Sequence, residues 1–167
     1  MIDPFWGSVF ANFRDAHCTM EISPHRGIDE ILLGASRDDI ESSLGPPEKK
    51  SKGQFEDGVE SWVWTYRLLR LELAFDSDVD FRLARITTTF PDVNIGGFNP
   101  IGLAENFLIV RYPDLELQLD CGDEGKDFID RELDISYWME NGIVASISIY
   151  PEYDDIEQVP RWPAKPL

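Results

Sequence analysis

One apolar pattern occurs twice in this chain and constrains its fold more than any other feature. Residues 71–91 (LELAFDSDVDFRLARITTTFP) hold two apolar alternating runs around an aspartate-rich turn. The apolar side chains of the two runs are Leu71, Leu73, Phe75, Leu83 and Ile86. Side chains alternate between the faces of a strand, so the first run puts its apolar residues on one face. The segment therefore predicts a β-hairpin that ends at Pro91.

The same spacing returns near the end of the chain. The residues that repeat it are Leu133, Ile135, Tyr137, Val144 and Ile147. The turn between the runs is tighter, at Glu140-Asn141-Gly142, and this copy also ends at a proline, Pro151. Asn-Gly is the commonest signal for a two-residue hairpin turn. Two copies of one hairpin indicate an internal duplication.

A helix is predicted ahead of each hairpin. In residues 36–44, Ser36 and Asp39 have the spacing of a capping box, and Gly45 ends the segment. In residues 101–111, an apolar stripe at helical spacing is formed by Leu103, Phe107 and Val110. A third helix is predicted at the start of the chain, where Asp3-Pro4 precede a stripe formed by Trp6, Val9, Phe10 and Phe13.

Further strands and loops follow from the same patterns. Residues 60–66 alternate around Trp62, Trp64 and Tyr66, and residues 115–119 alternate leucine with polar side chains, so both are predicted strands. Residues 48–58, with three lysines, and residues 122–130, rich in acids, are predicted to be exposed loops.

These elements predict an α+β fold made of two tandem units, each a helix plus an antiparallel β-meander. The units span about residues 26–91 and 98–151 and can join into one continuous sheet with helices on one face. We expect one domain over residues 1–167. Residues 152–167 are predicted to form an irregular, proline-rich tail that Trp162 can pin to the surface.

The charge balance is strongly acidic. The 167 residues contain 32 Asp and Glu against 15 Lys and Arg, a formal net charge of -17. This balance disfavours binding to bare nucleic acid or to an anionic membrane and favours a cationic partner. Acidity also serves solubility, so charge alone does not decide between the two interpretations.

The location of the protein is predicted from what the sequence lacks. No apolar run approaches the roughly 18 residues of a membrane span. The first residues carry Asp3 where a signal peptide carries Lys or Arg, and we predict an unprocessed, cytoplasmic protein. Cys18 and Cys121 lie far apart without a CxxC pair, which indicates two buried free thiols.

No catalytic or cofactor motif is present. The sequence has no GxSxG, HExxH, GxxxxGK[ST] or GxGxxG segment, and we predict no catalytic residue, no metal and no cofactor. His17 beside Cys18 is a weak candidate for a thiol pair, because adjacent strand residues face opposite sides. Paired carboxylates of a glycosidase type have no specific signal in so acidic a chain.

Acidic side chains with nearby aromatics are the candidate binding residues. Interfaces that form fast combine charge for steering with desolvated aromatic anchors. The first stretch contributes Asp114, Glu116, Asp120, Asp123, Glu124 and Asp127. The repeated hairpin contributes Trp138 and Glu140, and the residues after it are Glu152, Tyr153, Asp154 and Asp155.

Four segments in this order resemble a family of small bacterial proteins with a duplicated helix and β-meander. They are ILLGASRDDIESSLGPP, LELAFDSDVDFRLARITTTFP, NPIGLAENFLIVRYPD and LDISYWMENGIVASISIYPEYDD. Some members resemble the β-lactamase-inhibitor-protein fold, and many are toxin-immunity proteins. The resemblance implies a binder that blocks a partner protein, with no catalytic residue to carry over.

The predicted function is therefore an acidic, non-enzymatic binding protein, most specifically an immunity protein that neutralises a cognate, basic bacterial toxin such as a nuclease. A structural or assembly adaptor for a basic protein is the alternative, and a carboxylate-dependent hydrolase is the third. Neither nucleic acid nor membrane is an expected partner, and the oligomeric state is left open.

One prediction concerns calcium. Asp76, Asp78 and Asp80 imitate three ligand positions of a calcium loop, but Phe81 replaces the turn glycine and Thr87 the bidentate glutamate. Millimolar calcium should therefore raise the melting temperature no more than magnesium does. A calcium-selective rise that Asp78→Ala abolishes would contradict this expectation.

Overall fold

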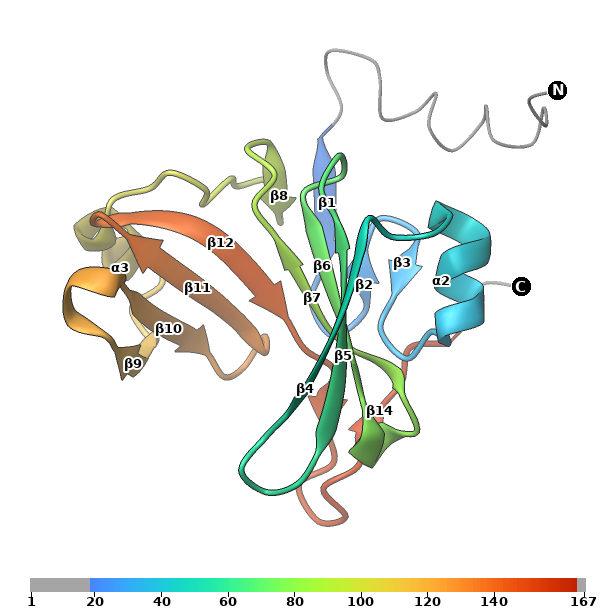
Figure 1. Cartoon of the computed structure of the whole chain (residues 1–167). Helices are drawn as coiled ribbons and strands as arrows, with labels where there is room; N and C mark the ends of the chain where they lie inside the picture. The colour runs from blue at the N-terminus through green and yellow to red at the C-terminus, as the bar shows by residue number, and fades with distance from the viewer. Residues whose placement is uncertain (1–18, 165–167) are drawn as a thin grey trace, which may run out of the picture.

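An eight-stranded antiparallel sheet organises the protein (Figure 1). The computed structural model describes residues 19–164, so the helix predicted near Trp6 and the His17-Cys18 pair lie outside the described residues. The strand order is β4-β5-β6-β7-β12-β11-β10-β9. The strands are β4 Lys49–Gln54, β5 Glu60–Tyr66, β6 Leu71–Asp76, β7 Arg82–Thr88, β9 Glu116–Asp120, β10 Lys126–Asp130, β11 Ile135–Glu140 and β12 Ile143–Ile149.

Smaller elements complete the fold. A second sheet has the order β3-β2-β1-β8, with strands β1 Met20–Ser23, β2 Gly27–Ile28, β3 Ile31–Leu32 and β8 Val93–Ile95. The helical elements are α2 Arg37–Leu44, α3 Glu105–Arg111 and the 3-10 turns η2 Ser77–Val79 and η3 Gly122–Glu124. Near the C-terminus, β13 Glu152–Tyr153 pairs with β14 Pro160–Arg161.

The predicted α+β fold of two tandem helix-plus-meander units is wrong. Strands take up 45% of the structure and helices 14%, so the fold is mostly β. The two α-helices of the described chain have only eight and seven residues. Residues 49–54 and 126–130, predicted as loops, are strands. Strand β4 lies at an edge with nearly every side chain exposed, so its sequence carries no apolar alternation to read.

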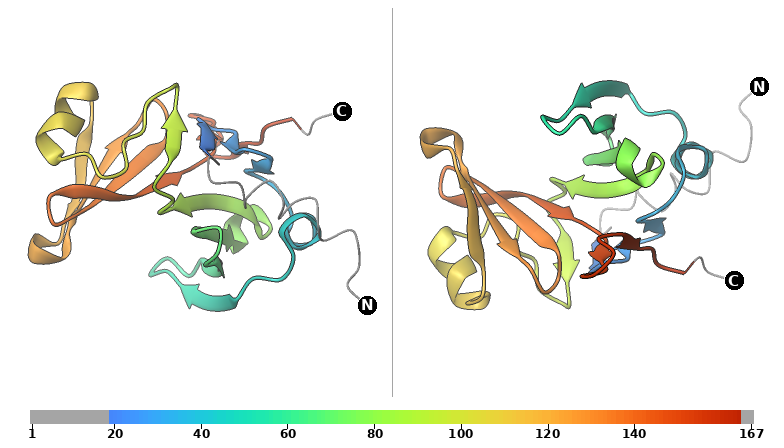
Figure 2. Two further views of the ribbon diagram at one scale, coloured as in Figure 1. Left: turned by 90° about the horizontal axis from the view of Figure 1, so that it is seen from above. Right: turned by 90° about the horizontal axis from the view of Figure 1, so that it is seen from below.

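Both predicted hairpins are confirmed. Strands β6 and β7 pair antiparallel, as do β11 and β12. Leu73 pairs with Ile86 and Tyr137 pairs with Ile147, and all four side chains are fully buried. They belong to one core cluster that also contains Met20, Ile22, Ile28, Ile31, Val93 and Ile95 of the small sheet. Figure 2 shows the small sheet against one side of the large one, whose two halves meet at an angle.

The hairpins correspond with a shift of two residues from the sequence match. Arg70 and Asp134 both have left-handed φ angles, 53° and 49°, and each precedes a strand by one residue. Leu71 therefore corresponds to Ile135 instead of Leu133. The carbonyls of Arg70 and Asp134 also accept matching bonds, from Thr89 N at 3.1 Å and Tyr150 N at 3.0 Å.

The chain enters both helices through the same hydrogen bonds. Gly34 N donates to Leu83 O and Gly102 N donates to Val144 O, both at 2.8 Å. Gly34 and Gly102 have φ angles of 83° and 80°, a region that favours glycine. The predicted capping box of α2 is confirmed, since Ser36 Oγ accepts from Asp39 N and Asp39 Oδ2 accepts from Ser36 N.

The predicted apolar face of α3 is wrong. Phe107 is 61% exposed and Val110 is 79% exposed, whereas Leu108 is fully buried. Residues 101–102 form a turn and the helix starts only at Glu105, so Leu103 lies outside it and the predicted stripe is not one helix face. No helix within residues 19–164 has the length and apolar character of a membrane span.

The proline-rich tail has more structure than predicted. It contains the β13–β14 pair, and Trp162 packs against the core. The indole ring of Trp162 lies over Gly34, where an added Cβ would come within 2.7 Å of Cε3. No atom lies within 4 Å of a Cβ added at Gly102, the corresponding glycine of the second half. The two sites therefore differ only in what covers them.

This difference gives a matched pair of substitutions. Gly34→Ala and Gly102→Ala should each destabilise the protein by about 1 kcal/mol or more, because alanine is strained at positive φ. Gly34→Ala should lose about 1–2 kcal/mol more, since its methyl group displaces Trp162. Urea unfolding measures both. In a Trp162→Ala background the two substitutions should become equal, and a persisting difference would contradict the role given to Trp162.

Candidate functional site

Most of the predicted binding carboxylates lie at the β9 end of the large sheet (Figure 1). Asp114 precedes β9, Glu116 and Asp120 lie in the strand, and Asp123 and Glu124 form the η3 turn that follows it. All five side chains are exposed. We call this group, together with Leu117 and Leu119 of the same strand, the β9 edge surface. These acids lie close together because they belong to one continuous stretch of the chain, residues 114–124.

Basic residues beside the β9 edge surface are already paired. Arg131 Nε lies 2.6 Å from Glu116 Oε2, and Lys126 Nζ lies 3.1 Å from Glu105 Oε1 of helix α3. Four of the five acids, Asp114, Asp120, Asp123 and Glu124, take part in no ion pair shown for the described residues. The surface therefore has an excess of negative charge available to another molecule.

Trp138 borders this surface as a fixed ring. It pairs with Asp127 across β11 and β10, and Asp127 pairs with Leu119 of β9. The Trp138 ring covers Gly125, where a Cβ would lie 2.6 Å from Cζ2, and its Nε1 donates to Glu140 Oε1 at 2.8 Å. This candidate binding residue is thus half-buried, and its polar atom is satisfied within the sheet.

Asp127 differs from the acids around it because it is half-buried on the sheet. Burial raises the pKa of its carboxyl, while a hydrogen bond from Ser136 and the charge of Arg85 act to lower the pKa. Arg85 Nε is buried and makes no hydrogen bond to the described residues. The Asp127 carboxylate therefore interacts with Ser136 and Arg85 of the sheet and is less available for steering a partner than its exposed neighbours are.

The second predicted acidic stretch lies elsewhere. Glu152, Tyr153, Asp154 and Asp155 lie on or beside the β13–β14 hairpin, which Figures 1 and 2 place apart from β9. Asp154 accepts bonds from the backbone of Glu157 and Ile156 and from Arg161 Nη2, the last at 2.7 Å. These bonds lower the pKa of Asp154 to about 2. The carboxylate of Asp154 therefore stabilises its own turn.

A polar groove of about 240 Å³ lies beside that hairpin. Its lining residues are His25, Arg131, Glu132, Asp134, Glu152, Tyr153, Asp155 and Arg161. His25 Nε2 lies 3.0 Å from Asp134 Oδ2, and burial raises the pKa of Asp134 while His25 opposes that rise. The sequence analysis missed His25 and Asp134, because 108 positions separate them and no local pattern joins them. The groove has four carboxylates against two arginines and one histidine, so its basic groups offset only part of its negative charge.

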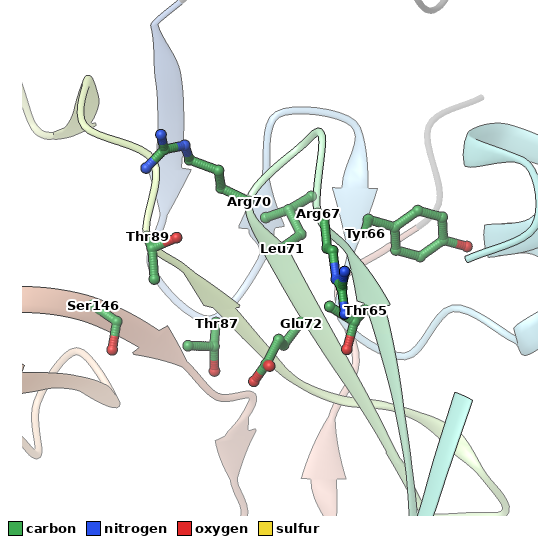
Figure 3. Close-up of a pocket in the computed structure, with 9 residues that line it drawn as sticks. All are labelled: Thr65, Tyr66, Arg67, Arg70, Leu71, Glu72, Thr87, Thr89 and Ser146. Atoms are coloured by element: carbon green, nitrogen blue, oxygen red, sulfur yellow. The ribbon is translucent and has the colours of Figure 1, made fainter. Parts of the chain in front are cut away.

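A larger groove of about 320 Å³ lies on the open face of the sheet, near the junction of its halves. Figure 3 shows Thr65, Glu72 and Thr87 directed to the same side, with Ser146 across from them on β12. Thr87 Oγ1 and Ser148 Oγ lie 2.7 Å apart. None of the sequence-predicted binding residues lines this groove. Hydroxyl groups of this kind can accept and donate hydrogen bonds to a partner surface.

Metal and thiol candidates are sparse in the described chain. Within residues 19–164, no three His, Cys, Asp or Glu side chains gather as they would around a metal ion. Asp76 ends β6, Asp78 lies in η2, and Asp80 follows with a left-handed φ of 56°. Cys121 is a free, half-buried thiol instead of the buried one predicted, and Cys18 lies outside the described residues.

Comparisons with known proteins show a likeness of fold. No protein-family model matches the chain, and no curated protein matches it by sequence. The crystal structure of yfeY from Escherichia coli is similar with a TM-score of 0.54 at 13% identity, over 80% of this chain and 99% of that chain. An extracellular protein containing an SCP domain from Bacillus anthracis matches with a TM-score of 0.43 at 13% identity, over 72% of this chain and 44% of that chain. Neither is described as a toxin-immunity protein, so that resemblance stays a prediction.

The burial of Asp127 predicts a pH-dependent stabilisation. The pKa of Asp127 is raised in the folded state, so at neutral pH the ionised carboxylate destabilises the folded protein relative to the unfolded chain. Asp127→Asn removes this charge and should therefore raise the free energy of unfolding at neutral pH. The gain should shrink as the pH falls through the raised pKa, where the wild-type group takes up a proton. Urea unfolding at about pH 7 and about pH 4 measures this.

The exposed Asp123→Asn is the control for that experiment, and its effect on stability should be small at either pH. If Asp127→Asn instead destabilises the protein at neutral pH, pairing with Arg85 outweighs the cost of burying the carboxylate.

Proposed function

We propose that this chain is a cytoplasmic, non-enzymatic acidic binding protein, and that it acts as an immunity protein which neutralises a cognate basic toxin by direct binding. The observation that supports this proposal is the β9 edge surface. It brings five exposed carboxylates around two exposed leucines, while Arg131 and Lys126 beside it are already paired. Charge and apolar area on one surface suit association with a protein.

The charge of the whole chain supports the same class of partner. A net charge of -17 attracts cationic surfaces over a Debye length of about 8 Å at physiological ionic strength and repels nucleic acid. A nuclease must present basic residues to its phosphate-rich substrate, so its active cleft would be complementary to this protein. Covering such a cleft blocks the enzyme without any chemistry on the part of the inhibitor.

An adaptor that binds a basic protein is the second candidate, because the β9 edge surface suits it equally. The two roles differ in what happens to the partner. An immunity protein restores growth of cells that produce its partner, whereas an adaptor binds a partner that is harmless alone.

The decisive experiment uses the protein encoded next to this chain in its genome. That neighbour should arrest growth when it is expressed alone, and co-expression of the full chain should restore growth. The two proteins should then co-purify by affinity capture on the full chain. Co-purification with a neighbour that is harmless alone would favour the adaptor. Growth arrest that the chain does not relieve, with no co-purification, would overturn the proposal.

Association of the purified pair should be fast at low salt and slow markedly as salt screens the charges. Asp123→Asn combined with Glu124→Gln should lower the on-rate while leaving the fold intact, since both side chains are exposed. The matched control is Asp155→Asn with Glu157→Gln, which removes the same charge from the exposed β13–β14 hairpin. Stopped-flow kinetics measures both, and a larger loss in the control would assign the partner to the hairpin.

A further inference from the structure

The two free edges of the large sheet differ in how they are protected. Strand β4 has lysines at positions 49, 50 and 52, and an edge rich in lysine resists pairing with another chain. Lys50 lies 3.5 Å from Glu41 and 4.3 Å from the centre of the Trp64 ring. Lys52 lies 2.9 Å from Glu60. Lysines protect the β4 edge, and the side chains of Lys50 and Lys52 lie against the Trp64 and Trp62 rings of β5.

Strand β9 has no such cover. It contains no lysine and no proline, it pairs only with β10, and no other strand of the described chain lies on its outer side. All five of its side chains are exposed, and Leu117 and Leu119 are each 52% exposed. An edge strand directs alternate N–H and C=O groups outward, where an added strand can pair with them.

The charges on β9 decide which strand can be added. A second copy pairing antiparallel about Gln118 would place Glu116 opposite Asp120 of the other chain, and like charges opposite each other are unfavourable. The β4 edge of a second copy is basic, but its Lys50 and Lys52 are already engaged by carboxylates and aromatic rings. A strand from a different, basic protein meets neither obstacle.

We infer that β9 is a strand-addition site, which takes an extended basic segment of a partner protein as a ninth strand of the sheet. This inference rests on the proposed function and specifies how the partner is held. The pairing of β9 with β10 skips Gln118, so Glu116 shares one face with Leu119 and Asp120 shares the other face with Leu117. A lysine or arginine on each face of the added strand would meet the acid of that face, and an apolar residue beside it would cover the leucine. Glu116 is paired with Arg131, but these side chains are 57% and 61% exposed, more than those of the Lys50 and Lys52 pairs, so this pair contributes little and is the more readily exchanged.

The test uses the full chain and a synthetic peptide of about nine residues that carries lysine and valine on both faces of its strand. A second peptide has the same sequence and charge, with its backbone nitrogens methylated so that it cannot pair as a strand. The first peptide should bind and slow hydrogen exchange of the β9 amides while leaving those of β4 unchanged. Methylation should weaken binding by about tenfold or more.

A charge reversal in the protein completes the test. Glu116→Lys should weaken binding of the unmethylated peptide several-fold, whereas Glu157→Lys, the same change on the exposed hairpin, should weaken it much less. Equal binding of the two peptides would overturn strand addition and leave the charge attraction of the proposed function standing.

Four other outcomes would also reject this site. Protection of β4 amides in place of β9 amides would move the site to the other edge. A dimer of the chain with β9 protected in the absence of peptide would give the edge to a second copy. If neither peptide binds but the neighbouring protein does, the proposed function survives and strand addition fails; if nothing basic binds, both fail.

Discussion

Three backbone pairs between β7 and β12 join the halves of the large sheet, and the rest of the structure depends on them. They are Thr88 with Ile147, Thr87 with Ser148, and Ile86 with Ile149. The hairpins on either side contribute six pairs each, so this junction is the narrowest part of the sheet. Its buried hydroxyl is satisfied, because Thr88 Oγ1 donates to Arg70 O at 3.2 Å and accepts from Phe90 N at 3.0 Å. The β9 end of the sheet is held to the other half through this short strip, and the hydroxyl-lined groove lies beside it.

Period-two patterns predicted the hairpins but not their correspondence. Matching Leu71 to Leu133 and matching it to Ile135 both keep apolar residues on the buried face, because a shift of two preserves the face of every side chain. The structure distinguishes these matches through the left-handed corners at Arg70 and Asp134. Neither residue is a glycine, so neither corner was marked in the sequence. The backbone angles of Arg70 and Asp134, and not the apolar pattern, therefore show which residues of the two hairpins correspond.

Local signals were read correctly where neighbours in sequence make the contacts. The capping box of α2 depends on residues three apart, and the charge of the β9–β10 hairpin depends on one continuous stretch. The misread parts depend on distant residues. Residues 49–54 are a strand because they pair with β5, at the edge of the sheet. At the end of α3, Tyr112 stacks on Tyr137 with ring centres 5.5 Å apart, whereas the predicted stripe had placed Val110 inward. The His25–Asp134 pair is likewise a product of the tertiary fold.

The two edges of the large sheet carry charges of opposite sign, positive on β4 and negative on β9. Complementary edges on a single chain would favour head-to-tail addition of copies, which does not close and leads to fibres. Here Lys50 and Lys52 of β4 are engaged from within, by Glu41, Glu60 and the rings of Trp62 and Trp64, so two of the three lysine charges on this edge are offset before another molecule arrives. The negative edge keeps four acids that take part in no ion pair shown for the described residues, Asp114, Asp120, Asp123 and Glu124. Charge that is neutralised at one edge and kept at the other suits a protein whose sheet is extended by a different chain and not by its own.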